Sequence, residues 1–220
     1  MAEGEKLVKE WLESDASLQM IAGLGTWLDA NRGLIARHPE AEVVELEATH
    51  LEQISTLQTP NNALVVAHMP ELSPPPVNEW CMALDTIQDP GNMGTILRIA
   101  DWFGINHVVC SPDCVDVFNS KVVQSAMGAH LRVQVHTCAL DAFFRKATIP
   151  ILAATLGGTN VYEVTPPDAA VLVIGNESKG ISPDLAAMAH KRITIPRLGG
   201  AESLNAGVSA GILCALLKIR

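Results

Sequence analysis

Aromatic residues are scarce in this sequence: four Trp, four Phe and one Tyr make up only 4% of the 220 residues. A core must therefore be built mainly from Ala, Val, Ile and Leu, and a content of 48% hydrophobic residues is enough for a sizeable one. Charged residues amount to 18%, and the 13 Pro and 16 Gly follow no period. These values exclude a disordered, collagen-like or coiled-coil chain.

Long apolar runs are also missing. The longest charge-free apolar stretch, residues 206–217, is shorter than the roughly 18–20 residues that a membrane span needs. Residues 1–11 lack the apolar centre of a signal peptide. The five Cys form no C-x-x-C pair and are odd in number, which favours reduced thiols and a cytoplasmic location. We therefore expect no contact with a membrane.

The motifs of several common enzyme classes are absent. The first glycine-rich loop, residues 87–94, fits neither GxGxxG nor GxxxxGK[ST], which argues against dinucleotide binding and against a P-loop ATPase. There is no HExxH, no paired Cys/His spacing and no GxSxG. We expect no metal site, and neither hydrolase nor dehydrogenase chemistry is supported.

The charge is distributed unevenly and indicates two domains. Residues 1–80 hold 4 Lys/Arg against 13 Asp/Glu, whereas residues 81–220 hold 11 of each, so the net charge of −9 lies in the first part. Residues 69–78 contain a three-proline run that forms neither helix nor central strand. We predict a small α/β domain over residues 1–70, a proline-rich linker over 71–79 and a second domain over 80–220.

Hydrophobic patterning predicts the elements of both domains. In the first domain we expect helices over residues 3–13 and 50–57 and strands over 41–47 and 63–68. In the second we expect strands over 80–85, 107–110, 149–155, 170–174 and 193–195. Between them we expect helices over 95–103, 120–128, 140–146, 182–189 and 203–218. Strands that alternate with helices predict an α/β domain whose parallel sheet is covered on both faces.

Three polar loops follow predicted strands, where ligands of such sheets bind. The first contains a turn at residues 89–91, Asn92 at the mouth of a helix and Arg98 nearly two turns further on. The second places Glu177 at the carboxyl end of a buried strand. Each of these loops, taken alone, is also typical of ordinary turns and helix caps.

The third loop leads into the last helix of the chain. Ser203 is a natural N-cap there, with Asn205 in the first turn. Small residues at Gly207, Gly211 and Ala215 leave a bare stripe on this helix. We expect another element, such as a second subunit, to pack closely on that stripe.

Together the loops carry three motifs in order: N-x-G-x-x-x-R at residues 92–98, I-G-N-E-x-x-G-I at 174–181 and I-P-x-x-G-x-x-x-S-L-N at 195–205. The set resembles the SpoU, or TrmH-type, RNA 2′-O-ribose methyltransferases of the SPOUT superfamily. The resemblance covers residues 80–220 closely. It extends weakly to Gly4-Glu5-Lys6, which looks like the start of the L30-like substrate-binding domain of that family.

The resemblance implies a fold, a cofactor and an activity. The fold is a parallel α/β SPOUT domain with a C-terminal trefoil knot, preceded by an L30-like domain, and the protein forms a homodimer. The knot holds S-adenosylmethionine, whose methyl group goes to a ribose 2′-hydroxyl of tRNA or rRNA. Motif positions imply cofactor contacts at Thr155, Leu156, Gly175, Asn176, Glu177, Gly180, Ile195, Pro196, Leu198, Ser203 and Leu204.

The matched motifs also imply a catalytic set: Arg98, Asn92, Glu177, Ser203 and Asn205. Arg98 is the usual candidate in this family for activating the hydroxyl. A guanidinium stays protonated, so we expect Arg98 to clamp a phosphate and polarise the hydroxyl rather than act as a free base. Asn92 and Asn205 would orient the acceptor, and Glu177 would anchor Arg98 or its loop.

Two features depart from the resemblance or oppose it. Arg197 stands where the family usually has Met, which puts a charge beside the cofactor loop. The acidic first domain repels phosphates, so we expect RNA contacts from cations of the second domain: Lys121, Arg132, Lys179 and Arg197. Two alternatives stay open: a non-enzymatic RNA-binding or scaffold protein with this fold, and a SPOUT enzyme that methylates a different acceptor.

Overall fold

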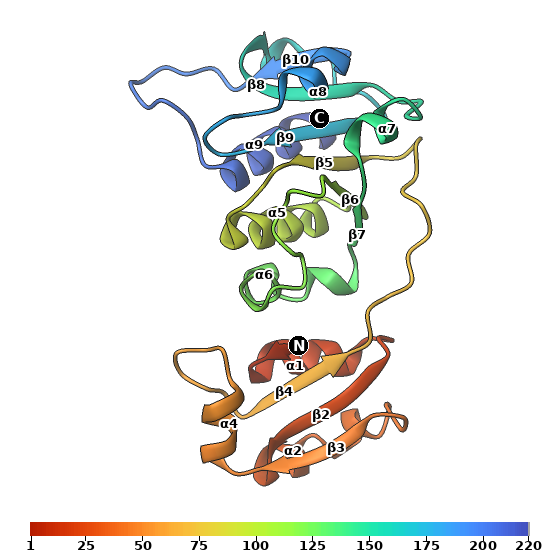
Figure 1. Cartoon of the computed structure of the whole chain (residues 1–220), viewed down its shortest axis with the longest axis vertical. Coiled ribbons are helices and arrows are strands. Elements are labelled where there is room, and N and C mark those ends of the chain that lie inside the picture. The colour runs from red at the N-terminus through yellow and green to blue at the C-terminus, as the bar shows by residue number, and fades with distance from the viewer. Residues whose placement is uncertain (220) are drawn as a thin grey trace. The chain divides into compact units, whose positions relative to one another are not determined.

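The computed structural model describes residues 1–219, which divide into two compact units, one over Met1–Glu71 and one from Leu72 onward (Figure 1). The N-terminal unit comprises β1 (Ala2–Glu3), α1 (Glu5–Glu13), β2 (Leu18–Leu24), α2 (Gly25–Ala30), α3 (Arg32–Ile35), β3 (Glu42–Leu46), α4 (Ala48–Ile54) and β4 (Ala63–Ala67). Its sheet has the order β1-β4-β2-β3, in which β4 is antiparallel to β1 and β2, and β2 is parallel to β3.

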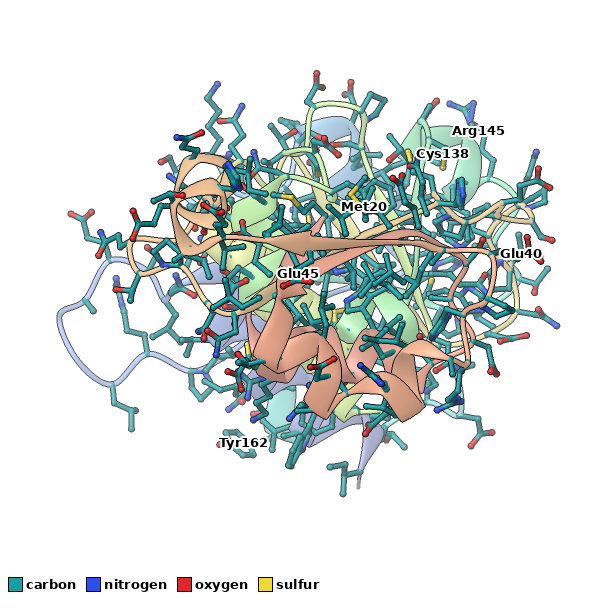
Figure 2. All side chains as sticks on the ribbon, turned by 90° about the horizontal axis from the view of Figure 1, so that it is seen from below. Met20, Glu40, Glu45, Cys138, Arg145 and Tyr162 are labelled. Atoms are coloured by element: carbon teal, nitrogen blue, oxygen red, sulfur yellow. The ribbon has the colours of Figure 1, made fainter. Side chains whose placement is uncertain are left out.

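The strand β2 was not predicted, although it pairs on both sides. Its sequence, LQMIAGL, does not alternate cleanly, and Ile21 and Ala22 are buried next to each other. β3 lies at the edge of the sheet and carries exposed carboxylates at Glu42 and Glu45, with Glu40 before the strand and Glu47 after it; Glu40 and Glu45 are labelled in Figure 2. Charges on an edge strand hinder pairing with further strands, which accounts structurally for part of the acidic excess.

The C-terminal unit begins its regular structure at β5. It comprises β5 (Cys81–Asp85), α5 (Pro90–Trp102), β6 (His107–Cys110), α6 (Ser120–Ala126), the 3-10 helix η1 (Ala129–Leu131), β7 (Gln134–Thr137), α7 (Leu140–Phe144), β8 (Ile151–Asn160), the 3-10 helix η2 (Val161–Glu163), β9 (Val171–Gly175), α8 (Pro183–Met188), β10 (Lys191–Thr194) and α9 (Ala206–Lys218). The strand order is β10-β8-β9-β5-β6-β7, and every pair is parallel. The predicted parallel α/β fold is therefore confirmed. Of the strands described in this unit, only the short polar edge strand β7 was not predicted.

Helices cover both faces of this sheet, and the central strand β5 shows how. Met82 and Leu84 belong to a buried cluster with residues of α5, α6 and α9, whereas Cys81 and Ala83 belong to one with residues of α7 and α8. All five residues of β5 are buried, as expected for a strand covered twice. Among residues 1–219 no helix has the length and apolar character that a membrane span requires.

In the C-terminal unit, two helices start three or more residues away from the predicted position. α5 starts at Pro90 rather than at residue 95, because the Asp89 side chain accepts a 2.8 Å hydrogen bond from Asn92 N and caps the helix where a separate turn was expected. α9 starts at Ala206, and its N-cap is Asn205, whose Oδ1 accepts from Val208 N at 3.2 Å. The predicted N-cap, Ser203, therefore lies in the loop before the helix.

The stripe of small residues on α9 is partly used within the chain. A Cβ atom added to Gly207 would lie 2.8 Å from Thr95 Cγ2, and one added to Gly211 would lie 3.5 Å from Ile99 Cδ1. Gly207 and Gly211 thus allow close packing of α9 on α5. Ala215, the third residue of the stripe, is exposed.

Candidate active site

The first and second polar loops meet where the strand order reverses, between β5 and β9. Asp85 and Gly175, the last residues of these strands, are register partners. The Asp85 carboxylate accepts a hydrogen bond from Ser182 N at 2.7 Å, and the Asn176 amide donates to Thr86 O at 2.8 Å. Such a reversal at the carboxyl edge of a parallel sheet is the usual place for a ligand.

A chain of side-chain hydrogen bonds joins all three motifs. Asn92 Nδ2 donates to Glu177 Oε1 at 2.7 Å, and Asn205 Nδ2 donates to Asn92 Oδ1 at 2.6 Å. Asn92 is only 8% exposed, so both ends of its amide depend on these two partners. Glu177 was expected to anchor Arg98 or its loop, but in this structure it anchors Asn92. Asn205 both caps α9 and contacts the first motif.

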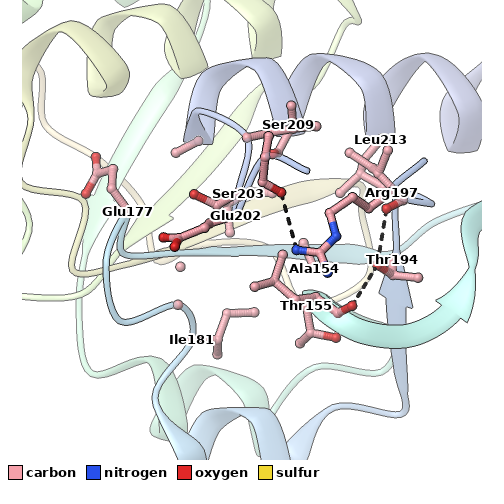
Figure 3. Close-up of a pocket in the computed structure, with 18 of the residues that line it drawn as sticks. Ala154, Thr155, Glu177, Ile181, Thr194, Arg197, Glu202, Ser203, Ser209 and Leu213 are labelled. Carbon is pink, nitrogen blue, oxygen red and sulfur yellow. Dashed lines mark hydrogen bonds between the residues drawn. The ribbon is translucent and has the colours of Figure 1, made fainter. Parts of the chain in front are cut away.

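A cavity of about 680 Å³ lies next to this chain of hydrogen bonds. Its walls are the middle of β8, the loop after β9, the loop between β10 and α9, and the first turns of α9 (Figure 3). Every residue for which a cofactor contact was expected lines it: Thr155, Leu156, Gly175, Asn176, Glu177, Gly180, Ile195, Pro196, Leu198, Ser203 and Leu204. The structure thus brings these residues together, while their contacts with a ligand remain predictions.

A bulge in β8 forms one wall of the cavity. Ala153 pairs with Arg192 and Thr159 with Ile193, so residues 154–158 have no partner in β10. Within this bulge Thr155 lines the cavity, and its Oγ1 is buried without a hydrogen-bond partner in the described part of the chain. A buried hydroxyl of this kind is available to a polar group of a ligand.

The turn from β9 into the loop that follows requires glycine at Gly175, the last residue of the strand. A Cβ atom on Gly175 would clash with the backbone of Gly180 and Ile181, because Asn176 and Gly180 close the loop with two backbone hydrogen bonds of 3.0 and 2.9 Å. Because Gly175 has no side chain, this tight loop can close at the wall of the cavity.

Arg98 lies outside the cavity. It is on the exposed face of α5, and its guanidinium has no hydrogen bond or ion pair with any of residues 1–219. On the same face Trp102, one turn further along the helix, is 82% exposed. A single copy of the chain therefore does not bring Arg98 to the other expected catalytic residues.

Sequence analysis missed a polar group beneath the first loop. Ser111 Oγ accepts from Thr86 N at 2.9 Å and lies 3.6 Å from Cys114 Sγ. A hydrogen bond from the Cys110 thiol lowers the pKa of Cys114 to about 6, although burial opposes the shift. The sequence indicated this group only by its position: Ser111 directly follows β6, and the carboxyl end of β6 lies next to that of β5. The cavity also contains Thr194, Arg197, Glu202 and Ser209, for which no cofactor contact was expected.

Comparisons with known proteins identify the family of this chain. The pattern of the SpoU rRNA Methylase family matches residues 79–215. The 23S rRNA (guanosine(2553)-2′-O)-methyltransferase RlmP of Bacillus subtilis (strain 168) is 29% identical, over 99% of this chain and 88% of its own.

Two solved structures share the fold over the same extent. A putative RNA methyltransferase of the TrmH family from Porphyromonas gingivalis has a TM-score of 0.88 and 41% identity, covering 99% of this chain and 88% of its own. An AdoMet-bound rRNA methyltransferase from Sinorhizobium meliloti has a TM-score of 0.87 and 25% identity, covering 99% and 86%. With the motifs joined in one site and the family pattern matched over most of the C-terminal unit, the chain belongs to the SpoU rRNA methylase family.

Proposed function

We propose that this protein transfers a methyl group from S-adenosylmethionine to a ribose 2′-hydroxyl of ribosomal or transfer RNA. The observation that carries the proposal is the cavity at the carboxyl edge of the sheet, whose wall residue Glu177 is hydrogen-bonded to Asn92 and, through Asn92, connected to Asn205. Support comes from family membership and from RlmP, a 23S rRNA 2′-O-methyltransferase.

The residues of the cavity fit S-adenosylmethionine. Ile174, Ile195 and Leu213 supply apolar walls for an adenine ring, and the buried Thr155 hydroxyl offers a polar partner. The tight loop at Gly175 lets a flat group approach the backbone closely. A volume of about 680 Å³ lies within the range of small-ligand sites, roughly 300–1,000 Å³.

Bound there, the cofactor supplies a methyl group already activated by its sulfonium, so the protein must mainly orient the acceptor and assist loss of the hydroxyl proton. Asn92 and Asn205 present fixed amides for this orientation, because their mutual contact and Glu177 hold them in place. Ser203 lines the cavity and offers a hydroxyl to the bound groups. Arg98, supplied by a second copy of the chain, clamps an RNA phosphate and polarises the hydroxyl.

A homodimer would bring Arg98 into reach. Apolar side chains are exposed on the two helices that pack together: Trp102 of α5 at 82%, Val208 of α9 at 50%, and Ile219 just after α9 at 69%. Exposed apolar surface of this kind is typical of an interface. Since one chain leaves Arg98 outside its own cavity, we place the Arg98 of one copy at the cavity of the other.

Three finer features belong to the same proposal. We assign a trefoil knot to the C-terminal segment, as the resemblance to the SPOUT superfamily implies; the loops after β9 and β10, which would form it, line one cavity. We assign the N-terminal unit, a small α/β sheet domain, as the L30-like substrate-binding domain, joined by the extended segment 71–79. A cytoplasmic location fits the five free Cys, which are typical of a reducing compartment.

The cations expected to contact RNA differ in availability. Arg132 donates two hydrogen bonds of 2.8 Å to the Asp101 carboxylate, so it is occupied by an ion pair, whereas Lys121 and Lys179 are exposed. We therefore keep Lys121 and Lys179 as RNA contacts. The role of Arg197 is treated below.

The decisive experiment compares Arg98→Ala with a control variant, Arg145→Ala, which changes an exposed arginine directly after α7. Arg98→Ala should lower methyl transfer to RNA at least about 100-fold, because a positioned charge at the reacting group is lost. Binding of S-adenosylmethionine, measured by calorimetry, should stay unchanged. Loss of cofactor binding in Arg98→Ala would contradict the assigned role.

The same assays separate the two alternatives. A scaffold protein would show no heat with S-adenosylmethionine while remaining folded. A SPOUT enzyme with another acceptor would leave the methyl on a base, which nuclease digestion and mass spectrometry of the methylated RNA detect.

A further inference from the structure

Among residues 1–219, Arg197 is the arginine that lines the cavity, and it lies in the loop between β10 and α9. Figure 3 shows its side chain pointing into the cavity. Its Nη1 donates one long hydrogen bond of 3.3 Å, to Ala201 O, and it forms no ion pair within residues 1–219. A guanidinium has five N–H donors, so most of its hydrogen-bonding capacity faces the cavity unused.

The loop that carries Arg197 has little packing of its own. The next residue, Leu198, is 99% exposed, and Cβ atoms added to Gly199 or Gly200 would meet nothing within 4 Å. The contact from Arg197 to Ala201 spans this segment at its base. A ligand that engages the guanidinium would therefore also order the loop.

The charges around the cavity determine which ligand group suits Arg197. The ionisable residues in the wall are Glu177, Lys179, Arg197 and Glu202. Glu177 is held by Asn92 at 2.7 Å. S-adenosylmethionine carries two positive groups, the sulfonium and the ammonium, and a single negative group, its carboxylate. A planar guanidinium matches a carboxylate with two parallel hydrogen bonds, which the ammonium of Lys179 cannot do.

We propose that Arg197 binds the carboxylate of S-adenosylmethionine and so determines recognition of the methionine end of the cofactor. This inference rests on the proposed function, since it concerns the same cavity. Sequence analysis predicted that Arg197 contacts RNA. The present proposal assigns Arg197 to the cofactor instead.

Calorimetry with two ligands tests the proposal on the full-length protein. S-adenosylmethionine and decarboxylated S-adenosylmethionine differ only in the carboxylate. The unaltered protein should bind the first about tenfold more tightly, as expected for one partly exposed charge-assisted pair. Arg197→Met, which keeps an unbranched side chain, should weaken binding of S-adenosylmethionine about tenfold and that of the decarboxylated ligand less than about twofold.

Two further variants complete the test. Lys179→Met removes an exposed positive charge from the same wall and so controls for the overall field: the preference for S-adenosylmethionine should change by less than about twofold. Arg197→Lys keeps the charge without the paired donors and should give an intermediate affinity. Thermal unfolding of each variant establishes that the fold is retained.

Several outcomes would overturn the proposal. Equal weakening of both ligands by Arg197→Met means that Arg197 only shapes the loop, and weakening of RNA binding alone means that it contacts RNA. Loss of discrimination in Lys179→Met instead would place the carboxylate at Lys179. If the unaltered protein binds neither ligand, the proposed function fails as well, whereas an unchanged preference in Arg197→Met refutes this inference alone.

Discussion

Asn205→Ala tests whether the contact between the first and third motifs matters for stability and for catalysis. The substitution removes two interactions: the cap on Val208 N at 3.2 Å and the donation to Asn92 Oδ1 at 2.6 Å. Loss of an N-cap costs about 1 kcal/mol, and loss of the contact with the buried Asn92 about 1 kcal/mol more. We expect the free energy of unfolding to fall by about 2 kcal/mol.

Two comparison variants separate the contributions. Asn205→Asp keeps an oxygen for the cap but has no amide donor for Asn92, so it should lose about 1 kcal/mol. Asn119→Ala removes the cap of α6, where Asn119 Oδ1 accepts from Lys121 N at 3.0 Å, and should also lose about 1 kcal/mol. Urea unfolding of the full chain, followed by circular dichroism, measures all three.

Methyl transfer provides the second readout of this experiment. Asn205→Ala and Asn205→Asp should both lower the rate, because Asn92 loses the partner that fixes its amide, whereas Asn119→Ala should keep full activity. If Asn205→Ala loses no more stability than Asn119→Ala and remains fully active, Asn205 is only a helix cap, and the chain of hydrogen bonds has no functional role.

Two further predictions concern packing and thiol chemistry. Gly94→Ala should destabilise the protein by about 3 kcal/mol through overpacking, because the added Cβ would lie 2.8 Å from Val122 O of α6. Thermal unfolding measures this effect, and a melting temperature within about 2 °C of that of the unaltered protein would refute the prediction. Iodoacetamide at pH 7 should alkylate Cys114 before Cys214, because the Cys110 thiol lowers the pKa of Cys114 to about 6 and burial raises that of Cys214 to about 12. Peptide mass spectrometry gives the order, and equal labelling would contradict it.

Much of the C-terminal unit was predictable because its strands are buried on both faces. A strand such as β5 or β9 is then a continuous apolar run, and the loop after it is polar, so the sequence marks both the strand and its carboxyl end. β2 was missed because Ile21 and Ala22 are buried in succession, and β7 because QVHT is polar; both are defined by the strands beside them.

The sequence by itself determined the parallel α/β fold, the family and the three motifs, because burial periodicity and motif order are properties of neighbouring residues. Only the tertiary structure decided that Asn205 is a cap bound to Asn92, that Arg98 lies outside the cavity of its own chain, and that Arg197 points into it. The direction of a polar side chain depends on hydrogen-bond partners far away in the chain, which local patterns do not encode.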